Sequence, residues 1–244
     1  MRTKSVAESD VDPRIIVALD TPSLDVARQL LKDLEGLVSF YKVGFELFAA
    51  HGWKAVELVR AAGGRVFLDL KLHDIPNTVS KTMAVLCEHD VDMVTVHTLG
   101  GYEMMKATRG IVDQRIQAGK KGPIILGVTI LTSHREAELE EDLGITRGLE
   151  EEVCYLAAVA KRAGLDGVVS SPHETAMLRQ KFPQNFLIVT PGIRPQGSSV
   201  GDQKRVFAPA EAIQAGASYL VIGRPITSAD SPKKEVLRIL SSLA

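Results

Sequence analysis

The segment Val66–Thr78 (VFLDLKLHDIPNT) decides the fold, because a short apolar run ends in a cluster of charges. Its first residues are too apolar for a strand that faces water, so they predict a buried strand. Side chains alternate across a strand, which projects Asp69 and Lys71 to the same side. Asp74 follows just beyond the strand, before a helix that Pro76 can begin. Two carboxylates and an ammonium are therefore expected in one small space.

Spacing alone leaves two interpretations of this cluster. Like carboxylates about 4 Å apart repel by roughly 4 kcal/mol at an effective dielectric constant near 20, so cations must lie between them. Lys71 is one such cation, and Lys42 is a candidate for the second. The cluster is then either a structural ion pair at a strand end or part of a functional site.

Composition limits the class of protein. A chain of 244 residues with 45% hydrophobic content can bury a full core, and its size suits one α/β barrel or two small domains. A formal net charge of -1 without a basic stripe argues against nucleic acid as a partner. Residues 1–13 contain no apolar signal region, and no later stretch is apolar enough to span a membrane. Cys87 and Cys154 lack CxxC spacing and read as buried thiols, so we expect a soluble, cytoplasmic protein.

Short apolar runs alternate with amphipathic stretches such as 23–34, where Ser23 is a candidate N-cap. This alternation is typical of βα units that build a parallel sheet. The expected strands are 14–20, 40–44, 66–71, 93–97, 124–129, 167–171, 186–191 and 219–223. Eight units predict a single (β/α)8 TIM barrel over residues 14–244, after an N-terminal extension, 1–13, of no assigned role. A doubly wound sheet is the alternative, but the first βα turn, 18–23, lacks the GxGxxG of a dinucleotide site.

Two connections are expected to be long loops. The first, 131–148, contains an acidic run at 136–142 that reads as a solvated helix face. The second, 192–206, is rich in glycine and polar donors, and we predict that it is a lid closing on a ligand phosphate. Arg194 and Gln203 are its expected phosphate contacts.

In an α/β barrel the carboxyl ends of the strands form the active site. The polar or turn-forming residues expected there are Asp20, Lys42, Asp69, Lys71, Thr132, Pro191, Gly223 and Arg224. Gly223 and Arg224 follow the eighth strand, where backbone amides of barrel loops often bind phosphate. His73 and His97 are interpreted as structural. Metal-ligand spacing is absent from the sequence and the two lysines would repel a divalent ion, so the site is predicted to be metal-free.

With these residues in place, the chain resembles the orotidine 5'-phosphate decarboxylase family from Ile15 to Thr227. The motifs that carry the resemblance are the DxKxxD segment in 67–76, Leu19-Asp20, Lys42–Gly44, Thr190–Arg194, Asp202-Gln203 and Gly223–Ile226. The resemblance implies a cofactor-free homodimeric barrel that converts orotidine 5'-phosphate into UMP and carbon dioxide, the last step of pyrimidine synthesis.

The resemblance also implies residue roles. Lys71 would protonate C6, and Asp69 would face the departing carboxylate, with Lys42 and Asp74 completing the charge network. The remaining implied contacts are Asp74, Ile75 and Thr78 with the partner subunit's site, Asp20 and Lys42 with the ribose, Thr132 with the pyrimidine, and Arg194, Gln203, Gly223 and Arg224 with the phosphate. Pro191, which ends the seventh expected strand, is also expected in the substrate site.

Two other functions are compatible with parts of this pattern. Sugar-phosphate decarboxylases and aldolases of the same suprafamily share DxKxxD but use Mg²⁺ and carry a glutamate where this chain has Lys42. A catalytically silent nucleotide-binding protein could keep the barrel and the phosphate site. A pure binding protein has no need for the mutually repelling charges of Asp69 and Asp74, which favours the enzyme.

Overall fold

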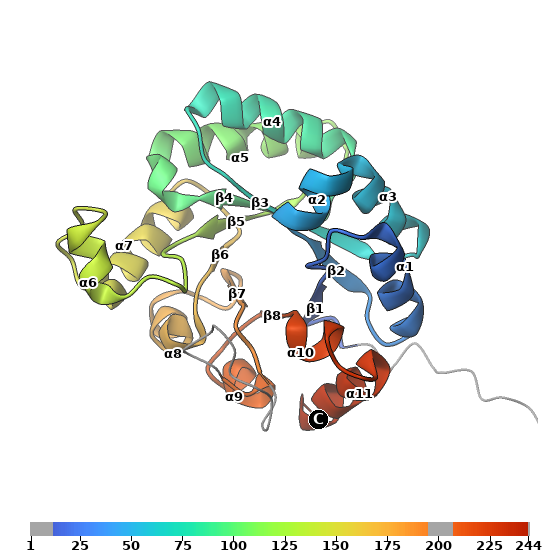
Figure 1. Ribbon diagram of the computed structural model, residues 1–244. Coiled ribbons are helices and arrows are strands. Elements are labelled where there is room, and N and C mark those ends of the chain that lie inside the picture. Colours follow the sequence, from blue (N-terminus) through green and yellow to red (C-terminus); the bar gives the residue numbers. More distant parts are fainter. Residues whose placement is uncertain (1–11, 195–206, 244) are drawn as a thin grey trace, which may run out of the picture.

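Eight parallel strands close into a barrel in which each strand pairs with its neighbours in the chain and β8 pairs with β1 (Figure 1). The computed structural model describes residues 12–194 and 207–243. The strands are β1 (Ile15–Ala18), β2 (Phe40–Val43), β3 (Arg65–Leu72), β4 (Met93–His97), β5 (Ile124–Val128), β6 (Gly167–Val169), β7 (Leu187–Thr190) and β8 (Tyr219–Ile222). The predicted barrel is confirmed, and every strand end lies within two residues of its predicted position.

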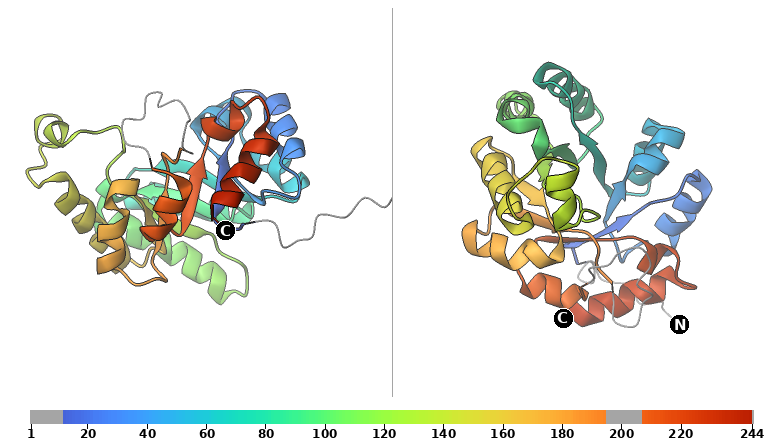
Figure 2. Two further views of the ribbon diagram at one scale, coloured as in Figure 1. Left: turned by 90° about the horizontal axis from the view of Figure 1, so that it is seen from below. Right: turned by 60° about the vertical axis from the view of Figure 1, so that its left-hand side comes forward.

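Helices surround the barrel (Figures 1 and 2). They are α1 (Leu24–Asp33), α2 (Phe45–His51), α3 (Trp53–Ala61), α4 (Pro76–Glu88), α5 (Gly101–Gln117), α6 (Glu136–Glu141), α7 (Leu149–Arg162), α8 (Pro172–Lys181), α9 (Pro209–Gln214), α10 (Arg224–Thr227) and α11 (Pro232–Leu243). Two predicted starts are confirmed, because Ser23 caps α1 by accepting from the Val26 amide and Pro76 is the first residue of α4. In the described part of the chain, none of these helices combines the length and the apolar composition needed to cross a bilayer.

The segment 131–148 is predicted to be a long loop with a helix face at its acidic run, 136–142, and it contains α6 over that run. The Glu138 carboxylate accepts from the Arg135 amide at 3.0 Å, which caps the helix, and Leu139 is fully buried beneath it. The charged residues on the other side remain in water, as expected for the acidic run. Figure 1 and the left view of Figure 2 show α6 projecting beyond the ring of helices.

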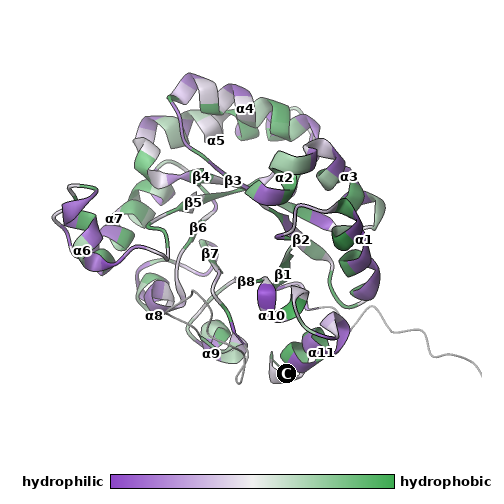
Figure 3. Ribbon diagram, in the orientation of Figure 1, coloured by the Kyte–Doolittle hydropathy of each residue, from purple (hydrophilic) through white to green (hydrophobic). Residues whose placement is uncertain are grey.

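The core has two shells. The outer shell packs one side of each strand against the helices, and the strands are accordingly mostly hydrophobic in Figure 3, whereas the helices carry both colours. The inner shell fills the barrel with the inward-facing side chains of Ile16, Ala18, Phe40, Phe67, Met93, Leu126, Val189 and Val221. The barrel interior is therefore solid, and any site must lie at one of its ends.

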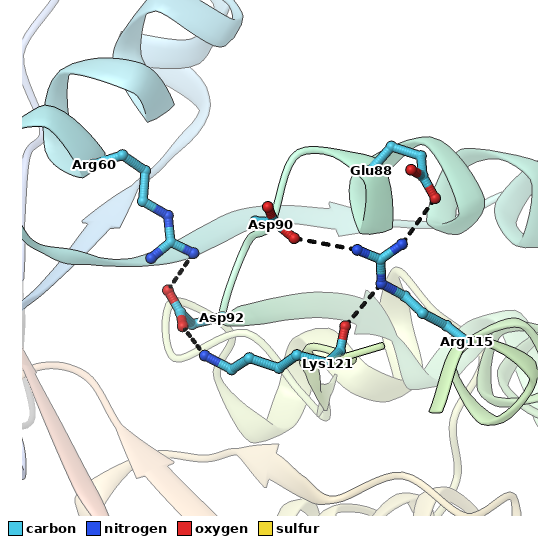
Figure 4. Close-up of polar contacts among 6 residues, drawn as sticks. All are labelled: Arg60, Glu88, Asp90, Asp92, Arg115 and Lys121. Carbon is cyan, nitrogen blue, oxygen red and sulfur yellow. Dashed lines mark hydrogen bonds and ion pairs between the residues drawn. The ribbon is translucent and has the colours of Figure 1, made fainter. Parts of the chain in front are cut away.

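The amino end of the barrel is held by ion pairs around two largely buried side chains, Asp92 and Arg115 (Figure 4). Asp92, directly before β4, is 3% exposed and accepts from the Val66 amide at 2.8 Å. Its carboxylate also contacts Arg60 of α3 at 3.0 Å and Lys121 at 2.7 Å. Nearby, Arg115 of α5 donates to Glu88, Asp90 and the Lys121 carbonyl. These contacts join α3, β3, β4 and α5.

The Asp92 arrangement occurs three times in the part of the chain that the structure describes, and we call each instance an amino-end staple. In each, a polar residue lies just before an even-numbered strand. Its side chain accepts a hydrogen bond from a backbone amide of the preceding odd-numbered strand. It also contacts an arginine of the helix that precedes the odd-numbered strand. The three sets are Arg60, Val66 and Asp92; Arg109, Ile125 and Asp166; and Arg179, Ile188 and Ser218. The staples fix the strand register at the end opposite the polar carboxyl ends.

Candidate active site

A cavity of about 450 Å³ opens at the carboxyl ends of the strands. Nine of the residues predicted from the sequence line it, namely Asp20, Lys42, Asp69, Lys71, Thr132, Pro191, Arg194, Gly223 and Arg224. Strand alternation explains the placement of the charges. Lys42 and Asp69 each stand two positions after an inner-shell residue, Phe40 or Phe67, so they lie directly above the filled interior.

The charges form a row of alternating sign. Lys42 Nζ lies 2.9 Å from Asp20 Oδ1 and 3.6 Å from Asp69 Oδ2, and Lys71 Nζ lies 2.9 Å from the same Asp69 oxygen. The side chains of Lys42 and Asp69 are only 12% and 11% exposed. Lys42 is thus the second cation that the sequence required between the carboxylates.

Asp69 is a buried but ionised carboxylate. Burial raises the pKa of this carboxyl, but the Lys42 and Lys71 ammonium groups, with hydrogen bonds from Lys71 and Thr95, outweigh burial and hold the pKa below its ordinary value. The site therefore keeps a fixed negative charge beside Lys71.

Lys71 departs from regular strand geometry. Leu68 pairs with Val94 and Leu72 with Val96, so β3 advances four residues over a distance in which β4 advances two. This bulge gives Lys71 a positive φ of 44°, in the left-handed region. The prediction that Asp69 and Lys71 meet by plain alternation is corrected in this respect, because their contact is made through a bulge.

Thr95 is a buried contact of this pair that the sequence reasoning missed. Its hydroxyl accepts from the Lys71 amide at 2.9 Å and donates to Asp69 Oδ1 at 2.9 Å. A signal was present, because Thr95 interrupts the apolar strand MVTVH on the same face as the inner-shell Met93. The cavity-lining residues that the sequence reasoning missed are Ala18, Glu46, Val128, Ile130, Leu131, Val169, Ser170 and Val221. Phe67, Gly192, Ile193 and Pro225 also line the cavity and lie within the motifs named above.

Arg194 is the buried cation at another side of the cavity. It is 8% exposed, and the described residues offer no hydrogen-bond acceptor to its buried Nε. Gly223 and Arg224 line the same cavity, with Arg224 as the first residue of α10. Gln203 and most of the predicted lid, 192–206, lie outside the described residues.

Asp74, Ile75 and Thr78 do not line the cavity of their own chain. All three are exposed, Ile75 at 66%, and Asp74 Oδ1 accepts from the Ile75 amide at 2.6 Å. The row of charges in one chain therefore consists of Asp20, Lys42, Asp69 and Lys71, without Asp74.

The two histidines beyond the row stack on each other. The rings of His73 and His97 are 5.3 Å apart at 22°. Burial, together with nearby His73, Lys71 and His134, lowers the pKa of His97 to about 4, so its ring is neutral at neutral pH. Among residues 12–194 and 207–243, no group of three or more His, Cys, Asp or Glu side chains could hold a metal ion.

Comparison with known proteins gives one consistent family. A model described as "Orotidine 5'-phosphate decarboxylase / HUMPS family" matches residues 13–239. A protein of Moorella thermoacetica named "Orotidine 5'-phosphate decarboxylase" is 49% identical over 220 residues, covering 90% of this chain and 87% of the relative. A protein of the same name from Photobacterium profundum is 45% identical over 234 residues, 96% of this chain and 100% of the relative.

Solved structures agree. The crystal structure of orotidine 5'-phosphate decarboxylase from Lactobacillus acidophilus superposes with a TM-score of 0.82 at 36% identity, covering 95% of this chain and 99% of that one. An uncharacterized conserved protein from Geobacillus kaustophilus gives a TM-score of 0.83 at 39% identity, covering 94% and 100%.

Proposed function

Because the chain belongs to the orotidine 5'-phosphate decarboxylase / HUMPS family, we infer that its cavity decarboxylates orotidine 5'-phosphate to UMP, a reaction of pyrimidine biosynthesis. The observation that carries the assignment of residues is the row Asp20–Lys42–Asp69–Lys71 in that cavity. The proposed chemistry needs both signs of charge at one place, and the row supplies them.

Lys71 is the proposed proton donor. Loss of carbon dioxide leaves an electron pair on C6, and an ammonium already in place attracts this developing charge more strongly than it attracts the neutral carbon. The resulting carbon–hydrogen bond takes its proton from Lys71 Nζ. The carboxylate of Asp69, 2.9 Å away, holds the ammonium at that point.

Asp69 and Lys42 have complementary proposed roles. Asp69 stays ionised and faces the substrate carboxylate, whose departure relieves the repulsion between them. Lys42 bonds both Asp20 and Asp69, so it keeps the two carboxylates apart and orients Asp20 toward the ribose hydroxyls. Thr132, which lines the cavity, is proposed to lie beside the pyrimidine.

The phosphate is proposed to bind Arg194, Gly223 and Arg224, with Pro191 beside them and with Gln203 from beyond the described residues. The support is the Arg194 guanidinium, which is buried against the cavity with an Nε–H that has no acceptor among the described residues. A buried donor of this kind is costly unless a ligand accepts from it, and phosphate oxygens fit a guanidinium well.

The alternative is a metal-dependent sugar-phosphate enzyme of the same suprafamily, and Lys42 argues against it. Its ammonium lies between Asp20 and Asp69, where a divalent ion would need carboxylates free for coordination. We therefore propose a reaction without a metal or another cofactor.

A homodimer with shared active sites completes the proposal. Asp74, Ile75 and Thr78 follow the cavity residue Lys71 closely in the sequence, but they do not line the cavity of their own chain. An exposed isoleucine next to a carboxylate suits a position at a subunit interface. Asp74 would then serve the partner's Lys71. The two cysteines are free and buried, which fits the proposed location in the reducing cytoplasm.

The direct test is to incubate the purified protein with orotidine 5'-phosphate and follow the ultraviolet absorbance as UMP forms. Product should appear at the same rate after exhaustive dialysis against EDTA. Activity that is lost with EDTA and returns with Mg²⁺ would place the chain in the metal-dependent branch, and absence of UMP formation in both conditions would refute the decarboxylase assignment.

A further inference from the structure

Thr95 makes two hydrogen bonds, one to each of the two residues proposed to act on the substrate. Its Oγ1 lies 2.9 Å from the Lys71 amide nitrogen and 2.9 Å from Asp69 Oδ1, and the residue is 1% exposed. A hydroxyl has one proton to donate, and an ionised carboxylate can only accept. The directions are therefore fixed, with Lys71 N–H donating to Thr95 and Thr95 O–H donating to Asp69.

The first bond stabilises an unfavourable backbone. Lys71 has a φ of 44° within the β3 bulge, a conformation that is unfavourable for a non-glycine residue and persists only where its surroundings impose it. The bulge also takes the Lys71 amide out of the regular strand pairing, and the Thr95 hydroxyl supplies its acceptor. Thr95 thus holds the main chain from which the Lys71 ammonium projects.

The second bond sets the rotation of the Asp69 carboxylate. Thr95 binds Oδ1, which leaves Oδ2 to contact Lys71 at 2.9 Å and Lys42 at 3.6 Å. Without the hydroxyl, Oδ1 loses a buried donor, and only the two lysine contacts at Oδ2 then set the orientation of the carboxylate. A displacement of about 1 Å in such a site can reduce a reaction rate by roughly a hundredfold.

From these two bonds we propose that Thr95 is a positioning residue, whose hydroxyl fixes Lys71 and Asp69 relative to each other for proton transfer. The inference rests on the proposed function of that pair. Thr95 does not itself line the cavity, so it acts on the substrate only through its two partners. Its removal should therefore lower kcat and leave ligand affinity nearly unchanged.

The test compares three single variants with the wild type. Thr95→Val keeps the shape of the side chain and removes the hydroxyl, whereas Thr95→Ser restores it. Thr98→Val is the matched control, because Thr98 is also 1% exposed but donates only to the Val128 carbonyl, at 2.7 Å. Each protein is measured for kcat and KM with orotidine 5'-phosphate, for its Kd for UMP and for its melting temperature.

Thr95→Val should lower kcat by about 30- to 100-fold, as expected for displaced reacting groups, with the Kd for UMP within about threefold of wild type. Thr95→Ser should recover kcat to within about threefold, and Thr98→Val should lose thermal stability but keep kcat. The acid limb of the kcat profile should also move to higher pH in Thr95→Val, because the lost hydrogen bond had lowered the pKa of Asp69.

Wild-type kcat in a folded Thr95→Val protein would overturn the positioning role alone, since the active wild type would still support the proposed function. An inactive wild type would overturn the proposed function and this inference with it. If Thr95→Val does not fold, Thr95→Ala replaces it. Failure of both to fold, alongside an active Thr95→Ser, would make Thr95 a purely structural residue and also overturn the proposal.

Discussion

Lys71 Nζ and Asp69 Oδ2 are 2.9 Å apart, although the two residues lie on one strand and an undistorted strand would only set them side by side. The bulge in β3 brings them together. This contact gives the chain a paired acid and carboxylate at one wall of the cavity.

Lys71→Ala should lower kcat by at least about 1000-fold, because the other cation at Asp69, Lys42, lies farther away at 3.6 Å and is also bonded to Asp20. UMP should still bind through contacts elsewhere in the cavity. Steady-state kinetics and calorimetric titration with UMP check this. Lys32→Ala, an exposed lysine on α1, is the control and should behave as wild type. Turnover within about tenfold of wild type, a barrier change of only about 1.4 kcal/mol, would exclude Lys71 as the essential acid.

Arg194→Met should weaken UMP binding by about 30- to 100-fold, because the buried guanidinium would lose a charge-assisted bond to phosphate of roughly 2–3 kcal/mol. Uridine has no phosphate, so its weaker binding should be the same in wild type and variant. Calorimetric titration with both ligands separates the two effects. An equal loss for uridine would show that Arg194 supports the cavity rather than the phosphate.

Asp92→Asn should reduce the free energy of unfolding by about 2–4 kcal/mol without changing kcat in the folded protein, because it weakens a buried carboxylate bound by two cations at the end opposite the cavity. Urea unfolding provides the measurement. Glu88→Gln removes an ion pair of the same network whose carboxylate is 67% exposed, and it should cost less than about 1 kcal/mol. Equal losses of unfolding free energy in the two variants would show that the burial of Asp92 does not make its ion pairs more stabilising than that of Glu88.

His97 predicts a loss of stability in mild acid. Its pKa is lowered from 6.5 to about 4 on folding, so between these values the unfolded chain binds more protons than the folded one. The stability from a neutral His97 is complete above about pH 6.5 and declines as the pH falls toward about 4. Urea unfolding at pH 5 and pH 7.5 should give a smaller difference for His97→Gln than for wild type, and an unchanged difference would assign the effect to other groups.

Subunit mixing tests the shared site. Lys71→Ala and Asp74→Ala homodimers should each be nearly inactive. Unfolding and refolding them together should make about half the dimers mixed, and each mixed dimer has one site with both native residues, which recovers about a quarter of wild-type activity. If Asp74 served its own chain, mixed dimers would have no intact site, so confirmed exchange without recovery would refute the proposal.

The elements that follow from local patterns could be predicted from the sequence, and those that depend on contacts across the barrel could not. Alternating apolar runs located all eight strands, and the position of Asp69 and Lys71 at a strand end led to the cavity. The bulge at Lys71 escaped prediction because it depends on how β3 pairs with β4. In the sequence, Thr95 is a single polar residue within an apolar strand, and Asp92 is a single polar residue before the same strand. Their partners come from other elements and approach them only in the folded barrel.

The third amino-end staple is one place where the stability of the barrel can still be increased. Its acceptor, Ser218, is neutral where the other two staples have Asp92 and Asp166, and burial lowers the pKa of its arginine, Arg179. An aspartate at position 218 would give that guanidinium the charged partner the others already have. The cavity lies at the other end of the barrel. Substitutions in the cavity that change substrate specificity and lower the stability of the fold could therefore be compensated at position 218 without altering the active site. In this barrel, stability and substrate specificity can therefore change at separate ends of the fold.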